Sequence, residues 1–140
     1  MELSKSNRER IVEELRAAAS FMQKVSDPRQ KAYYYSAAYG VLERGFRTQF
    51  HPTLQFAFMV LQSSYTQLNA RAGQIAAGDR LVPFVEGVWE GVEESLIELA
   101  KRIEHERDCF DVLERISFFT FLTTGAGFYM YQRGDLKQYR

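Results

Sequence analysis

The sequence predicts an all-α protein: an up-and-down bundle of four long helices plus a fifth, apolar helix near the C-terminus. Apolar residues recur at alternating spacings of three and four, the period of one helix face. Only 3 of the 140 residues are proline, and no run alternates apolar and polar residues as a half-buried strand does. A chain of this length fits one domain. We therefore expect residues 1–140 to form a single unit, with a tail at 133–140 that frays.

The first two helices are predicted from their start signals. Ser6 and Glu9 have the spacing of a capping box, so the first helix should begin near Ser6 and stop at residues 26–28. Asp27 is positioned to cap a second helix, which has Pro28 in its first turn and runs to about Phe50. The expected core positions are Ile11, Leu15, Ala18, Met22 and Val25 in the first helix, and Ala32, Tyr35, Tyr39, Leu42 and Phe46 in the second.

A third helix should run from about Pro52 to Ala77, after the break at residues 51–52. Between Thr48 and Ala70 the chain has no Asp, Glu, Lys or Arg. A helix face in water normally carries charges, so a long neutral face is predicted to be covered by another helix of the chain or by a second copy. Its polar residues are Gln55, Gln62, Ser63, Thr66, Gln67 and Asn69.

The fourth helix should begin near Pro83 and carry its acids opposite an apolar stripe. The stripe falters at residues 104–108, which fits either a turn or one bent helix over 84–124. The last helix, over 108–124, is apolar nearly all round, so it should be central or lie in an interface. Residues 125–127 should loosen it, and the aromatic segment 128–131 should pack against the bundle.

The zero net charge, from 18 basic and 18 acidic residues, argues against a phosphate backbone as the main partner. The charges are unevenly distributed: residues 1–50 have nine basic and six acidic residues, and residues 84–114 have three basic and ten acidic residues. The acidic face at 86–98 fits a solvated surface. It also fits a docking surface for a basic partner, or self-assembly in which the acidic helix packs against a basic one.

Cysteine usage and hydropathy indicate a cytoplasmic protein. Cys109 is the one cysteine, so no internal disulfide and no cysteine metal cluster is expected, which is typical of a reducing compartment. The charged segment 1–10 does not read as a secretory signal. The uncharged run 116–132 is predicted to be a buried helix. Peripheral membrane association through 116–131 is the third functional hypothesis.

Two pairs of residues could support chemistry. Arg44 and His51, with six residues between them, resemble the arginine–histidine motif of HEPN-type ribonucleases, which are also small helical bundles. The resemblance implies an RNA-associated domain in which these two side chains are catalytic. The sequence departs from the motif, because Gly45 follows the arginine where the family has a polar residue, and the pair spans a helix break. The structural interpretation is that His51 caps a helix.

His105 lies four residues before Cys109, so the imidazole and thiol would share a face if the helix continued. Such a pair could begin a zinc site or a Cys–His nucleophile, but a zinc site needs further ligands and a nucleophile needs an orienting group. The structural interpretation is a polar corner between helices with a buried thiol. We expect no metal and no cofactor.

These observations favour a non-enzymatic protein-interaction or assembly module, either a homo-oligomer or a subunit of a complex. The HEPN-like ribonuclease is the alternative. The expected partner is a second copy or another protein, rather than nucleic acid or a membrane. The predicted interface residues are Gln55, Gln62, Thr66, Asn69, Phe118, Phe121, Phe128 and Tyr131.

Overall fold

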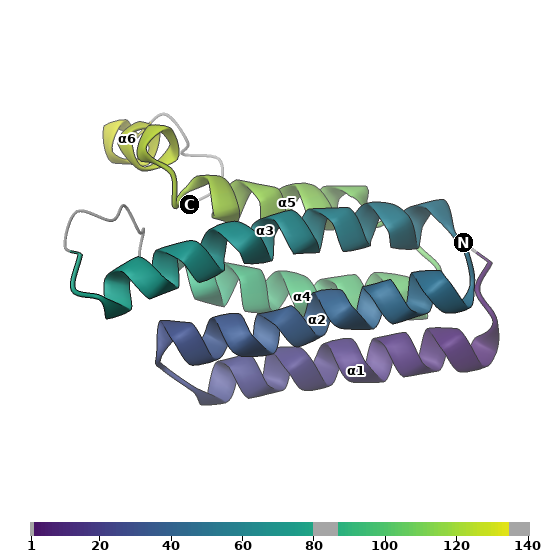
Figure 1. Ribbon diagram of the computed structural model, residues 1–140. Coiled ribbons are helices and arrows are strands. Elements are labelled where there is room, and N and C mark those ends of the chain that lie inside the picture. Colours follow the sequence, from purple (N-terminus) through teal and green to yellow (C-terminus); the bar gives the residue numbers. More distant parts are fainter. Residues whose placement is uncertain (1, 80–86, 135–140) are drawn as a thin grey trace.

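The computed structural model describes residues 2–79 and 87–134, and this part of the chain contains six α-helices and no strand. The all-α prediction is confirmed (Figure 1). The helices are α1 (Lys5–Lys24), α2 (Pro28–Thr48), α3 (Pro52–Ala76), α4 (Val88–Glu104), α5 (Phe110–Phe121) and α6 (Gly125–Arg133).

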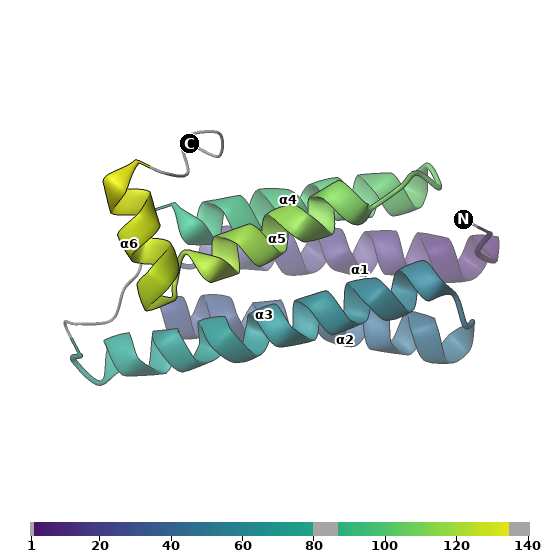
Figure 2. The same cartoon turned by 90° about the horizontal axis from the view of Figure 1, so that it is seen from above.

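Helices α1 to α4 form a bundle in which successive helices run in opposite directions (Figure 1). Helix α2 packs between α1 and α3, and α4 packs on the other side of α1. Helix α5 lies over the side of the bundle between α3 and α4 and contacts both, while α6 crosses one end (Figure 2). The predicted up-and-down bundle, with short loops, would place each helix beside the next one along the chain. At α3 this is wrong, because α5 takes the place beside α3 that the expectation gave to α4.

The N-terminal capping box is a second correction. Helix α1 begins one residue before Ser6, and Ser4 is the cap, with its hydroxyl accepting a hydrogen bond from the Asn7 amide at 3.3 Å. The start moves because the preceding segment is anchored: Leu3 is buried, and the Ser4 amide donates to Gln49 Oε1 at 2.8 Å. The extended segment thus delivers Ser4 to the cap position.

The next two helix starts follow the predicted signals. Asp27 caps α2, with Pro28 in the first turn, and its carboxylate accepts from the Arg29 amide at 3.1 Å. His51 caps α3. Helix α3 ends at Ala76, and Gly78 follows with φ of 89°, a left-handed conformation that favours glycine after a helix. The expected start near Pro83 lies outside the described residues.

After α4 the chain forms two helices, α5 and α6, where one helix was expected. A turn separates α4 from α5, so the alternative of one bent helix is wrong. Thr124 then caps α6 by accepting from the Gly127 amide at 3.0 Å, so residues 125–127 begin a helix rather than loosening one. Gly127 is required here, because a Cβ at this position would lie 2.0 Å from the carbonyl oxygen of Phe121.

Helix α5 is also less uniformly apolar than its sequence suggested. Its buried side chains are Val112, Leu113, Ile116 and Thr120. Asp111, Glu114 and Arg115 are exposed, so the helix has one face in the core and one face outside it. Such an arrangement is typical of a helix that covers a bundle rather than one that forms its centre.

A buried ion pair ties three helices together. Lys31 on α2 places its Nζ 2.6 Å from Glu93 Oε2 on α4, and the same Nζ donates to the carbonyl oxygen of Met22 on α1 at 2.8 Å. Both charged residues are buried. Burial raises the pKa of Glu93 above its usual value, and the neighbouring Lys31 ammonium partly offsets that rise. Each charge therefore depends on the other for compensation.

Replacing one partner of this pair should be strongly destabilising. Glu93→Leu leaves the Lys31 ammonium buried without its counter-charge, and we expect a loss of about 3 kcal/mol or more in the free energy of unfolding, measured by urea denaturation. The double variant Lys31→Met/Glu93→Leu should regain most of that loss. As a control, Glu14→Leu breaks an exposed ion pair with Arg44 and should cost less than about 1 kcal/mol. A double variant no more stable than Glu93→Leu would contradict this account.

Candidate functional site

The strongest candidate site is the seam between α3 and α5. Phe56 meets Phe110 near the start of both helices, and Ser64 meets Thr120 further along both, so the two helices run parallel. Helix α3 has 25 residues and α5 has 12, so α5 covers only part of the side of α3. The residues on the outward-facing side of the seam are therefore exposed to solvent.

At one end of the seam two phenyl rings form what we call the aromatic ridge, Phe56 and Phe110. Their centroids are 6.1 Å apart and their planes differ by 8°, so the rings are stacked. The residues are 43% and 59% exposed. The ridge is therefore an apolar feature of the surface, with about half of each residue in contact with solvent.

Further along the seam lies a groove of about 430 Å³, formed entirely by residues of α3, α5 and the residue Thr124. Its floor is the buried pair Ser64 and Thr120. None of the residues that line it is charged. The apolar members are Phe56, Met59, Val60 and Phe121, and the polar members around the floor are Ser63, Gln67, Ser117 and Thr124.

The floor of the groove belongs to a chain of buried hydrogen bonds. The Tyr35 hydroxyl on α2 donates to Ser64 Oγ at 2.8 Å, and Ser64 Oγ lies 2.6 Å from Thr120 Oγ1. Thr120 Oγ1 donates to the carbonyl oxygen of Ile116 at 2.8 Å. Because the Thr120 proton is used there, Ser64 is the donor to Thr120. Burial raises the pKa of Tyr35, so its proton stays on the phenol.

The predicted interface residues divide between this face and α6. Those on α3 are exposed along its outer face, and Phe121 lines the groove. Phe118 is half-buried, as are Phe128 and Tyr131 of α6, and all three pack against the core. The α3 residues in question are Gln55, Gln62, Thr66 and Asn69.

Sequence reasoning missed Phe56, Met59 and Phe110 as surface residues. Met59 is 57% exposed and lies on α3 between the ridge and the far part of the groove. A signal was present, because Phe56 and Met59 fall outside the three-and-four spacing of Leu54, Ala57 and Leu61 on the same helix. An apolar residue outside the core stripe is a candidate for a surface contact.

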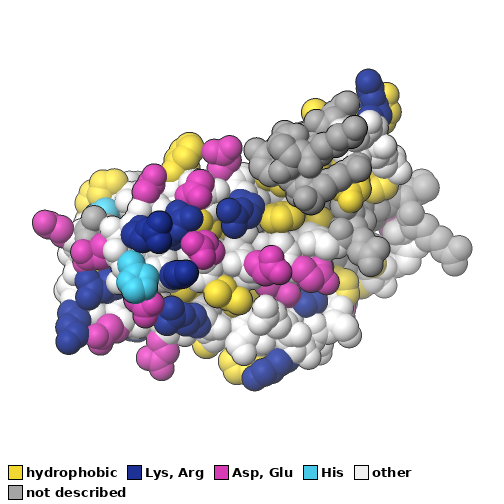
Figure 3. Space-filling view, turned by 180° about the vertical axis from the view of Figure 1, so that it is seen from behind, with side chains coloured by type: hydrophobic (Ala, Val, Ile, Leu, Met, Phe, Trp, Pro, Cys, Tyr) yellow, Lys and Arg dark blue, Asp and Glu magenta, His cyan; other side chains and the backbone are white. Residues whose placement is uncertain are grey.

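The α1–α4 side of the molecule has a different character. Seen from behind, it carries basic and acidic side chains interleaved over α1 and α4 (Figure 3). Arg8 pairs with Glu106 there, and Arg16 with Glu104 at 2.9 Å. The charge difference between the two segments of the sequence is thus partly balanced within the chain, where the end of the acidic helix meets the more basic α1.

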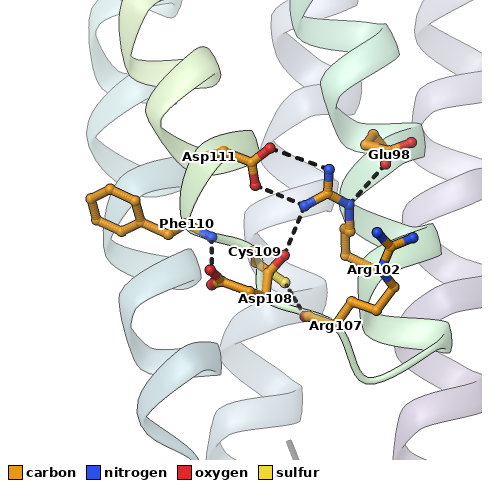
Figure 4. A network of polar contacts seen from close by, with 7 residues as sticks. All are labelled: Glu98, Arg102, Arg107, Asp108, Cys109, Phe110 and Asp111. Atoms are coloured by element: carbon orange, nitrogen blue, oxygen red, sulfur yellow. Dashed lines mark hydrogen bonds and ion pairs between the residues drawn. The ribbon is translucent and has the colours of Figure 1, made fainter.

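The corner between α4 and α5 is held by Arg102 (Figure 4). Its guanidinium donates to Glu98 at 2.9 Å, to Asp111 at 2.7 Å and to the carbonyl oxygen of Asp108 at 2.8 Å. The hydrogen bond that Asp111 accepts from Arg102 lowers the pKa of Asp111 below its usual value. The network fixes the direction of α5 relative to α4 and therefore the position of Phe110, the first residue of α5.

The same corner separates His105 from Cys109. Helix α4 ends at residue 104, so the imidazole and thiol do not share a helix face: His105 is exposed and Cys109 is buried. The Cys109 thiol donates to the carbonyl oxygen of Arg107 at 3.5 Å. Within the described residues no group of three or more His, Cys, Asp or Glu side chains is arranged to hold a metal ion.

The side chains of Arg44 and His51 are engaged by other groups. Arg44 on α2 donates to Glu14 on α1 at 2.8 Å. His51 precedes α3, and its Nδ1 accepts a hydrogen bond from the Thr53 amide at 3.1 Å. Both contacts have structural roles: one joins two helices at the surface, and the other satisfies a free amide at a helix start.

Comparison with known proteins adds no relative. The chain matches no protein-family model, and neither a curated protein nor a solved structure matches it significantly. Among the described residues, no helix is both long enough and apolar enough to span a membrane.

The buried thiol should be unreactive in the folded protein. Burial raises the pKa of Cys109 to about 11, so at pH 8 almost no thiolate is present. Iodoacetamide should therefore alkylate Cys109 much more slowly in the native protein than in urea, as followed by intact mass. Equal rates in the two states would contradict both the burial and the raised pKa.

Proposed function

We propose that the chain is a non-enzymatic assembly module that binds a second copy of itself through the α3–α5 side. The surface concerned, called here the neutral face, consists of the outer side of α3 from Gln55 to Asn69, the groove and the aromatic ridge. The observation that carries the proposal is that the outer side of α3 from Gln55 to Asn69 has no charged residue, while Phe56 and Met59 on α3 and Phe110 on α5 are exposed to solvent.

An uncharged surface with apolar groups at its centre is energetically favourable to remove from water. Burying exposed apolar side chains against a partner lowers the free energy by roughly 25 cal/mol per Å² of apolar area. Amide and hydroxyl side chains around them can exchange water for a partner at little cost, whereas buried charges carry a large desolvation penalty. A neutral polar rim around an apolar centre is the usual composition of a protein–protein interface.

A second copy is the occupant that fits this charge pattern. In a twofold dimer each surface meets itself, so a face with net charge would meet like charge. The neutral face avoids that repulsion, since Thr48 to Ala70 contains no ionisable Asp, Glu, Lys or Arg and the groove is lined by uncharged residues. The α1–α4 side has both signs of charge, much of it already paired within the chain.

A charge in the middle of the neutral face should prevent assembly. In a Met59→Lys variant two ammonium groups would meet across the interface, so light scattering coupled to size-exclusion chromatography should give the dimer mass for the parent protein and the monomer mass for the variant. The substitution should weaken self-association by about tenfold or more, which corresponds to about 1.4 kcal/mol.

The matched control is Ile97→Lys, which makes the same kind of change at a residue 40% exposed on α4. It should assemble like the parent protein, as should Arg44→Ala. A parent protein that is monomeric at all concentrations tested would overturn the proposal. Equal loss of assembly in Met59→Lys and Ile97→Lys would overturn the assignment to the neutral face.

A further inference from the structure

We propose that the two copies meet antiparallel across the neutral face, so that the aromatic ridge of each copy fills the groove of the other. The inference rests on the proposed function and adds the orientation of the dimer and its anchoring side chains. Its basis is that a projection and a hollow of the same apolar character lie side by side along a single seam.

The geometry of the seam restricts how two copies can be related. The ridge lies at the start of α3 and α5, and the groove extends toward their ends as far as Gln67 and Thr124. Phe56 and Gln67 are eleven residues apart, about 16 Å along a helix at 1.5 Å per residue. A face-to-face dimer has its twofold axis in the plane of the face, and the two limiting directions of that axis are along the seam and across it.

Those two axes have different consequences for packing. An axis along the seam gives a parallel dimer, in which ridge meets ridge and groove meets groove, so the rings collide and the hollows stay empty. An axis across the seam gives an antiparallel dimer, in which each ridge faces a groove. Interfaces are packed about as densely as protein interiors, so the second arrangement is favoured.

The chemistry of the groove floor suits a phenyl ring. The protons of Tyr35, Ser64 and Thr120 are all donated within the chain, the last one to the carbonyl oxygen of Ile116. A ring that covers the floor therefore leaves no hydroxyl donor without an acceptor, which is the costly case for a buried polar group. Met59, Val60 and Phe121 provide the apolar contacts above the floor.

Charges at the two ends of the seam also favour the antiparallel arrangement. Asp108 is exposed next to Phe110 at the ridge end. Arg71 lies one helical turn beyond Gln67 at the groove end, where its Nε donates to the carbonyl oxygen of Thr123 at 2.9 Å. Antiparallel copies bring Asp108 of one toward Arg71 of the other, whereas parallel copies would place like charges together.

Arg107, the basic residue that precedes Asp108 in the sequence, points away from the ridge. Figure 4 shows the Arg107 side chain on the side of Arg102, away from the Phe110 ring. Asp108 is the charged residue that lines the hollow next to the ridge, and Glu114, which is also acidic, is exposed one helical turn beyond Phe110. Met59 lies between the ridge and the far end of the groove, so an axis across the seam passes near it and brings it close to its own copy.

Cysteine cross-linking between two tagged chains tests the orientation. One chain carries Thr53→Cys, at a half-buried residue beside the ridge, and the other carries Gln67→Cys, at an exposed residue of the groove, so the rings of both ridges are kept. The chains have tags of different size, and are mixed, allowed to exchange and treated with a short bis-maleimide. The parent chain, whose Cys109 is buried, serves as the blank for background reaction.

The antiparallel dimer predicts one product, the heterodimer in which residue 53 of one chain is linked to residue 67 of the other. A parallel dimer predicts the two homodimers and little heterodimer, and this result would overturn the inference while leaving the proposed function intact. Light scattering of the same mixture before cross-linking distinguishes the remaining case. A monomer mass there would overturn the proposed function, and the orientation with it.

A second variant pair tests the anchors themselves. Phe110→Ala removes half of the ridge at an exposed position and should weaken self-association by about tenfold or more, as expected for a buried aromatic anchor. Phe21→Ala, an equivalent truncation of a ring 49% exposed on α1, should leave the affinity unchanged. Equal affinities for both variants would show that the ridge is not an anchor, even if the dimer exists.

Discussion

The packing of α5 over the side of the bundle between α3 and α4 is the constraint on which the candidate surface depends. The contact is specified by the hydrogen-bonded pair of Ser64 and Thr120 among the otherwise apolar buried residues of α3 and α5, and by Arg102 at the turn that precedes α5. A polar pair satisfied inside a core favours one arrangement of its helices, because other arrangements leave hydroxyls unpaired. Since α5 is half as long as α3, closing the core leaves the outer side of α3 uncovered.

The two sides of the bundle consequently have different relations to solvent. On the α1–α4 side two surface ion pairs, Arg8 with Glu106 and Arg16 with Glu104, form within the chain, and the buried Lys31–Glu93 pair joins α2 to α4 below the surface. On the α3–α5 side the chain presents rings, a thioether, amides and hydroxyls. The ion pairs of the first side form within one copy. The second exposes apolar groups whose removal from water would be favourable, and we therefore assign assembly to it.

The sequence predicted those features that are set locally. Helix periodicity, the Asp27–Pro28 start and the uncharged stretch after Thr48 can be read one helix at a time. The position of α5 could not be, because it depends on tertiary contacts such as Ser64 with Thr120, which in the sequence are only polar interruptions of apolar stripes. The choice of Ser4 over Ser6 as the cap likewise depended on Gln49, a residue 45 positions away. The groove exists only once two helices are placed side by side.

Hydroxyl-radical footprinting at low and high protein concentration tests the central claim most directly, since it shows which face becomes covered on assembly. The account predicts that oxidation of Phe56, Met59 and Phe110 falls as the concentration rises. Phe21 and Tyr33, which are exposed on α1 and α2, should be oxidised equally at both concentrations. Protection of Phe21 and Tyr33, with Met59 unchanged, would contradict the claim that the neutral face is the assembly surface.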